Sequence, residues 1–155
     1  MALMDLGTSN LMETAGKMAI AYVLAVPSGW QGEREGRSVG IRTFPIVAVA
    51  SCGYMLLAVQ GNAGSGDYRA LQGLMTGIGF IGGGAILREG ATVHGTATAA
   101  SVWAIGAVGA AVAIGRLDIA ALLAVVNFLT LRVLLPLKHR LEHSDRSDDT
   151  LPPGH

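Results

Sequence analysis

The chain has 155 residues, which is enough for one domain, and its composition argues against a protein that folds in water. Only 14% of its residues are charged and 51% are hydrophobic, whereas a soluble domain has about 25% charged residues. A formal net charge of zero gives no support to a nucleic-acid partner, and the single cysteine, Cys52, excludes an intramolecular disulfide.

Long stretches without charge divide the chain into predicted membrane helices, because about 20 mainly apolar residues are needed to cross a bilayer. The first span is the weakest, since it contains Glu13 and Lys17, and Pro27 is expected to kink or end its helix. None of the spans alternates as a half-buried strand does. The sequence therefore predicts an all-α integral membrane protein of five transmembrane helices packed through small residues, over residues 11–30, 43–60, 69–88, 96–115 and 117–137.

The basic residues are distributed unequally between the two sides of the predicted membrane. One side holds the 31–42 loop, the 88–95 loop and the polar tail, and it carries seven Lys and Arg residues against three on the other side. The positive-inside rule then places the N-terminus outside and the C-terminus in the cytoplasm. We expect a transmembrane domain over residues 1–137, followed by a flexible polar cytoplasmic tail over residues 138–155.

The stretch GIGFIGGGAIL at residues 77–87 admits two interpretations. Gly77, Gly79 and Gly82 spell G-x-G-x-x-G, but a dinucleotide-binding turn follows a strand and is followed by an acid about 20 residues later. The residues before the motif look helical, and no Asp or Glu occurs from 91 to 115. Nucleotide binding is therefore the weaker interpretation.

Close packing of membrane helices explains the glycines better, since small residues four apart let two backbones approach each other. We expect the third and fourth spans to pack through such rows, with a kink or break at residues 82–84 because glycine weakens a helix. A broken helix at membrane depth either packs in protein or lines a cavity, so a solute path is the alternative to packing. The residues concerned are Gly73, Gly77, Gly79, Gly82, Gly83 and Gly84.

Polar side chains gather at the start of the fourth span. Hydroxyl groups there cap a helix or hydrogen-bond a neighbouring helix, which is the favoured interpretation, and lining a small polar cavity is the alternative. Gln72, Asn127 and Thr130 are candidates to join this group from neighbouring spans. Its members are Thr96, Thr98, Ser101 and Trp103.

Charged side chains near the cytoplasmic side predict little chemistry. The carboxylates of Glu33 and Glu35 suit Mg²⁺, but this ion is seldom held by protein ligands alone, so we predict no metal site. Arg132 lies inside the last span, where it either snorkels to the surface or has a function. Since no catalytic set stands out, we predict neither an enzyme nor a cofactor. The other candidates on this side are Arg42, Thr43 and Arg88.

Three motifs together resemble the MgtC/SapB family of bacterial inner-membrane proteins. They read GIRTF at residues 40–44, GIGFIGGGAILR at 77–88 and GTATAASVW at 95–103, in the order that the family has them. The resemblance covers residues 11–137 and implies a five-helix domain of the bacterial inner membrane. It also implies a link to growth in low magnesium, to survival of pathogens inside host cells and to modulation of membrane proteins such as ATP synthase.

The chain departs from the family pattern in two places. The family has a Glu-Arg pair seven residues before its Gly-Leu-Arg-Thr motif, where this chain reads Gln31-Gly32, with Glu33-Arg34 two residues later. Some members also carry a soluble C-terminal domain that is regarded as regulatory, and we expect none here.

The leading functional hypothesis is a non-enzymatic membrane protein that modulates a membrane partner, or magnesium homeostasis, under stress. The alternative is a small oligomeric carrier or channel for an ion or small solute. The expected partners are the lipid bilayer and either a second copy of the chain, with a dimer favoured, or another membrane protein.

Overall fold

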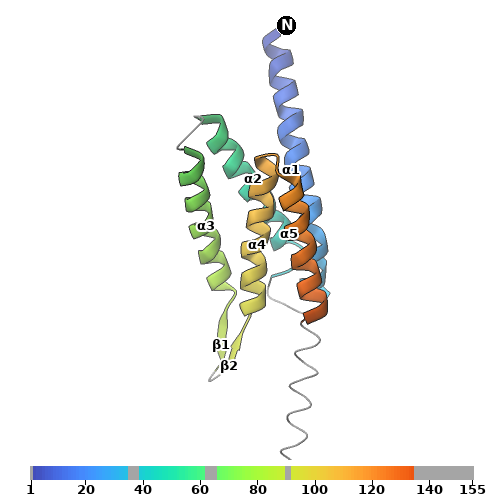
Figure 1. Ribbon diagram of the computed structural model, residues 1–155, viewed down its shortest axis with the longest axis vertical. Helices are drawn as coiled ribbons and strands as arrows, with labels where there is room; N and C mark the ends of the chain where they lie inside the picture. Colours follow the sequence, from blue (N-terminus) through green and yellow to red (C-terminus); the bar gives the residue numbers. More distant parts are fainter. Residues whose placement is uncertain (1, 35–38, 62–65, 90–91, 135–155) are drawn as a thin grey trace, which may run out of the picture.

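A computed structural model describes residues 2–34, 39–61, 66–89 and 92–134 of the chain. These residues form five α-helices, one short β-hairpin and a π-helical turn, so the predicted all-α class is confirmed (Figure 1). The helices are α1 (Ala2–Arg34), α2 (Thr43–Gly61), α3 (Gly66–Gly84), α4 (Thr96–Ala113) and α5 (Leu117–Leu129). The hairpin pairs β1 (Leu87–Glu89) with β2 (Thr92–His94), and the π-helical turn η1 (Thr130–Leu134) continues α5.

Two elements differ from their sequence-based expectation. Helix α1 does not end at Pro27 but continues to Arg34, and the loop before α2 lies against its last turns. A Cβ at Gly29 would lie 2.9 Å from Cα of Ile41, so only a glycine allows this contact. The segment expected to be a loop, residues 88–95, contains most of the hairpin, whose strands are too short to produce an alternating pattern.

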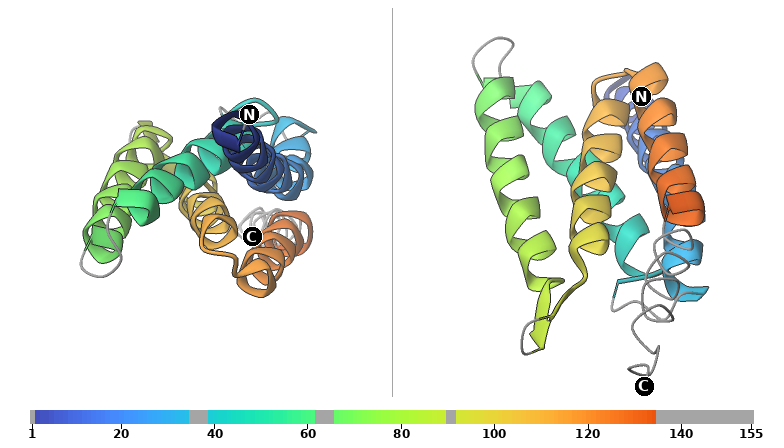
Figure 2. Two further views of the ribbon diagram at one scale, coloured as in Figure 1. Left: turned by 90° about the horizontal axis from the view of Figure 1, so that it is seen from above. Right: turned by 60° about the horizontal axis from the view of Figure 1, so that its bottom comes forward.

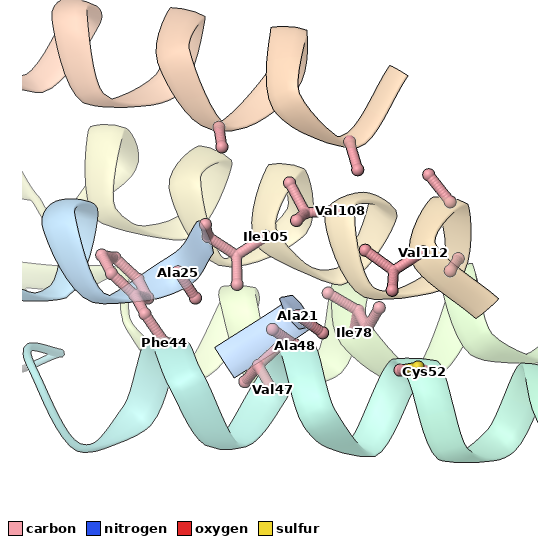
Figure 3. Packing of buried hydrophobic residues seen from close by; sticks show 14 of the residues in the cluster. Ala21, Ala25, Phe44, Val47, Ala48, Cys52, Ile78, Ile105, Val108 and Val112 are labelled. Carbon is pink, nitrogen blue, oxygen red and sulfur yellow. The ribbon is translucent and has the colours of Figure 1, made fainter. Parts of the chain in front are cut away.

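Helix α4 occupies the centre of the bundle and contacts each of the other four helices. Helix α2 crosses the bundle obliquely, with α1 near one of its ends and α3 near the other (Figure 2). The core lies between the five helices, and α3 contributes Ile78 to it (Figure 3). Its largest fully buried side chains include Phe44, Ile105, Leu131, Val102, Val108 and Val112.

The length and apolar character of α4 are sufficient for a membrane crossing. It is the one helix among the described residues that meets this criterion, and the apolar part of α2, Thr43–Val59, is shorter. The core helix of a soluble protein meets the same criterion.

Candidate functional site

The six candidate glycines of α3 occupy two environments. Gly82 is buried against α4, where a Cβ would lie 3.1 Å from the carbonyl oxygen of Ala99. The other five are exposed, and a Cβ on any of them would meet nothing within 4 Å: Gly73, Gly77, Gly79, Gly83 and Gly84. Contact between α3 and α4 therefore uses one glycine of this block rather than the rows of small residues expected from the sequence.

Helix α3 ends inside the glycine block, at Gly84. The backbone N–H of Ala85 donates to the carbonyl oxygen of Gly82 at 3.0 Å, and that of Ile86 donates to Gly83 at 3.1 Å. These bonds span three residues instead of four, which tightens the last turn of the helix before β1 begins. The chain leaves the helix here for the hairpin, so residues 82–84 form a terminus rather than a mid-helix break.

Two glycines of α4, which the sequence did not single out as site residues, lie where a neighbouring helix leaves no room for a Cβ. A Cβ at Gly109 would collide with the carbonyl oxygen of Ala48 on α2, and one at Gly106 would collide with the side chain of Ile78 on α3. Their partners lie tens of residues away in the chain, so sequence spacing does not indicate them. Helix α4 thus supplies the small residues that let α2 and α3 approach.

Gly95, between β2 and α4, is required by both its conformation and its surroundings. Its φ of 85° lies in the left-handed region that residues with a Cβ rarely adopt. A Cβ there would also collide with the carbonyl oxygen of Ala85. The junction between the hairpin and α4 therefore requires a glycine at position 95, which is the first residue of the GTATAASVW motif.

The polar group at the start of α4 is divided between the inside and the outside of the bundle. Thr98 and Ser101 are buried, whereas Thr96 and Trp103 are exposed. The hydroxyl of Ser101 donates to the carbonyl oxygen of Ala97 at 2.9 Å, so it is bonded within its own helix. This arrangement is typical of hydroxyl residues in helices.

Asn127 does not join this group but pairs with a serine of α1. Its Nδ2 donates to Oγ of Ser28 at 3.1 Å, and both side chains are buried. The pair joins residues 99 positions apart and ties α5 to α1 directly after Pro27. Gln72 and Thr130 are exposed, and the backbone oxygen of Gln72 accepts a hydrogen bond from the hydroxyl of Thr76 at 2.9 Å.

The charged candidates do not converge on one site. Oε2 of Glu33 accepts a hydrogen bond from the backbone N–H of Ile41 at 3.3 Å and lies beside Gly40, so this carboxylate holds the loop before α2. Arg42 and Arg132 are exposed, and Thr43 is half-buried at the first residue of α2. Glu35 and the side chain of Arg88 lie outside the described residues. Within the described ranges, no three His, Cys, Asp or Glu residues are grouped to hold a metal ion.

An apolar groove of about 560 Å³ lies between α2 and α3. It is lined from α3 by Gly73 and Gly77, among others, and from α2 by Ala50, Ser51 and Tyr54. No charged side chain lines it. Two of the exposed candidate glycines therefore share a concave surface, whereas Gly79, Gly83 and Gly84 do not contribute to it.

The chain is similar to known bacterial proteins over most of its length. Residues 18–140 match the MgtC family. Protein MgtC of Brucella abortus is 33% identical over 132 residues, which cover 85% of this chain and 56% of that protein. The uncharacterized protein slr0014 of Synechocystis is 32% identical over 131 residues, covering 84% of this chain and 56% of its own length.

A third relative carries a functional name. YhiD of Escherichia coli K12, which is named as a candidate magnesium transporter, is 27% identical over 133 residues, covering 81% of this chain and 62% of that protein. The chain thus spans little more than half the length of the curated relatives it matches. No solved structure matches it.

Proposed function

Because the chain belongs to the MgtC family, we propose that it is a non-enzymatic protein of the bacterial inner membrane that modulates a membrane partner, or magnesium homeostasis, under stress. The family membership agrees with the resemblance of the three sequence motifs. The association with magnesium rests on that resemblance and on the name of the relative YhiD.

The observation that carries the membrane part of this proposal is the distribution of side-chain sizes. Much of the buried core consists of alanine and valine, while large apolar side chains face outward. Phe80 is 87% exposed, Leu57 71% and Leu122 70%. In water such surfaces would drive aggregation. In lipid they are solvated without cost, and small residues inside the bundle let the helix backbones pack closely.

The use of the buried polar groups favours a modulator over a carrier. Ser101 is bonded within its own helix, and Ser28 and Asn127 are bonded to each other. These groups stabilise contacts within and between helices. Because the hydrogen bonds of these three side chains are made within the chain, they are not free to line a path for an ion, which a carrier would need.

A growth experiment tests the role in magnesium homeostasis. We expect deletion of the gene to slow growth in low-magnesium medium and to leave growth in high-magnesium medium unchanged. Expression of the wild-type chain should restore growth, and the protein should stay in the membrane fraction after alkaline extraction. Unchanged growth of the deletion strain in low magnesium would contradict the proposed role.

A flux experiment distinguishes the proposed function from the carrier alternative. Protein reconstituted into proteoliposomes is expected to give no saturable flux of Mg²⁺ above that of empty vesicles. A saturable flux that is lost in Thr98→Val or Gly83→Leu would instead support a carrier. Thr98 is buried and Gly83 is exposed, so the two variants probe the inside and the outside of the bundle separately.

A further inference from the structure

The groove between α2 and α3 covers only part of the length of the two helices. Its lining on α3 runs from Ala70 to Ile81, which is about 17 Å at the rise of an α-helix. On α2 it runs from Ile46 to Tyr54 and stops before Gly61, where that helix ends. The hydrocarbon core of a bilayer is about 30 Å thick, so the groove has the depth of one leaflet rather than of the whole membrane.

The two helices are not equally close along the groove. The end of α2 lies beside the start of α3, and from there the helices diverge toward Thr43 and Gly84 (Figure 1, Figure 2). The separation therefore increases toward the end of the groove that Ile46 and Ile81 line, and both of these side chains are exposed. A molecule that enters between the helices finds more room at this end.

A hydrocarbon chain suits the shape and the chemistry of the groove. No charged side chain lines it, and its volume of about 560 Å³ is that of a small-molecule site. A flexible acyl chain fills an irregular apolar surface of one leaflet's depth, whereas a partner helix that crosses the membrane runs over about 30 Å. Every membrane lipid has such a chain, so a preference for one lipid has to come from its headgroup.

Arg42 lies at the end of the groove where a headgroup would be. The backbone N–H of Phe44 donates to the carbonyl oxygen of Gly40, four residues earlier, at 3.2 Å, so the helical turn extends back over Arg42. Residues four apart share one face of a helix. Arg42 is therefore one turn beyond Ile46, the last residue of α2 that lines the groove at this end.

The guanidinium of Arg42 is available to a ligand. The side chain is exposed, and among the residues that the structure describes it makes no ion pair or hydrogen bond. The carboxylate of Glu33 accepts a hydrogen bond from the backbone N–H of Ile41 instead. A guanidinium matches phosphate oxygens well, and in the predicted orientation this end faces the cytoplasm, where the leaflet surface is negative.

We propose that the groove takes an acyl chain of an anionic phospholipid and that Arg42 binds the phosphate of the same lipid. The inference rests on the membrane location proposed above. The apolar lining holds the chain of any phospholipid, and Arg42 adds the preference for a headgroup with net negative charge. Phosphatidylglycerol is then bound more tightly than phosphatidylcholine, whose own cation competes with the arginine for the phosphate.

Native mass spectrometry of the purified full-length chain in detergent micelles tests the headgroup contact. With each lipid added separately, we expect one phosphatidylglycerol to bind with a dissociation constant about fivefold below that of phosphatidylcholine. Arg42→Gln should remove this preference and leave the binding of phosphatidylcholine unchanged. Arg69→Gln is the matched control, because Arg69 is also exposed but lies on α3 one turn before Gly73, toward the opposite end of the groove.

A second pair of variants tests the acyl chain. Gly77→Leu places a side chain in the groove, where a Cβ meets nothing within 4 Å, and should weaken the binding of both lipids about tenfold. Gly79→Leu adds the same side chain outside the groove and should leave both dissociation constants unchanged. Circular dichroism confirms that each variant is folded.

Each alternative outcome has a defined meaning. Equal affinity of the wild-type chain for the two lipids, or equal losses in Arg42→Gln and Arg69→Gln, would overturn the proposal. A lipid-free dimer that Gly77→Leu converts to a monomer would assign the groove to a second copy and would also overturn it. A chain that alkaline extraction releases from the membrane would contradict the proposed function, whereas a membrane-embedded chain without a lipid preference would contradict only the lipid site.

Discussion

Helices α3 and α4 are both rich in glycine, but they use it differently. In α4, Gly106 and Gly109 lie inside the bundle, and each leaves room for an atom of a neighbouring helix. In α3, Gly82 alone has this role among the six candidate glycines, and the others lie on open surface. The same residue type therefore stabilises the fold of the chain in one helix and leaves a face free in the other.

The comparison shows what glycine spacing means in a helix bundle. Small residues four apart indicate that some backbone can approach, but they do not say whether it belongs to the same chain. The answer depends on where the other helices lie. Substitutions that add a Cβ measure the difference directly. They should lower the free energy of unfolding where a neighbouring helix lies against the glycine, and should not lower it where nothing lies within 4 Å.

The largest effect is expected at Gly109. Gly109→Ala places a Cβ against the carbonyl oxygen of Ala48 and close to the Cβ of Ser51, and neither is the end of a flexible side chain. We expect the free energy of unfolding to fall by about 3 kcal/mol, the upper part of the range for overpacking. Equilibrium unfolding in mixed detergent micelles, followed by circular dichroism, measures it. An unchanged midpoint would mean that α2 and α4 are farther apart than described.

A smaller loss is expected at Gly95, where conformation and space act together. Gly95→Ala forces a residue with a Cβ into a φ of 85°, which costs about 1–2 kcal/mol, and it also meets Ala85. Gly95→Asn should recover part of the loss, because asparagine tolerates this conformation better. Gly84→Ala, at an open position near the same junction, serves as the control. Equal stability of Gly95→Ala and Gly84→Ala would contradict the described junction.

The sequence predicted the helices better than their contacts. Uncharged stretches indicated five helices because the apolar composition of a helix is a local property, and α2 and α4 begin at the first residues of the second and fourth predicted spans, Thr43 and Thr96. The hairpin was not predicted, because three residues per strand are too few to show a period. Helix α1 continues past Pro27, and the backbone of the loop before α2, which the sequence does not place, packs on Gly29.

The candidate residues illustrate the same limit. The glycine block, the hydroxyl group and the charged residues could be identified from composition and spacing, but whether they lie inside or outside depends on the tertiary arrangement. Ser28 and Asn127 form a buried pair across 99 positions, and Ser28 was not among the candidates because a single serine after a proline is not distinctive. Gly73 and Gly77 could be named as candidates from the sequence. The sequence could not show that these two line the groove whereas Gly79 and Gly83 lie outside it.

The buried hydrogen bond between Ser28 and Asn127 offers a third test, inside the helix bundle. Ser28→Ala removes the acceptor of the Asn127 side chain, and we expect a loss of about 1 kcal/mol. A double-mutant cycle with Asn127→Ala should show a coupling of similar size. Thr76→Val in α3 is the control, because the exposed hydroxyl of Thr76 bonds only within its own helix. The absence of coupling between Ser28 and Asn127 would contradict a direct hydrogen bond.

The smallest effect, and one of opposite sign, is expected at Gly79. A Cβ there meets nothing within 4 Å, and the position lies inside α3 and outside the groove. Gly79→Ala should therefore raise the free energy of unfolding by up to about 1 kcal/mol, through helix propensity alone. The same unfolding measurement checks it. A loss of stability as large as that of Gly109→Ala would mean that this side of α3 is also covered, and the distinction between filled and open glycines would fail.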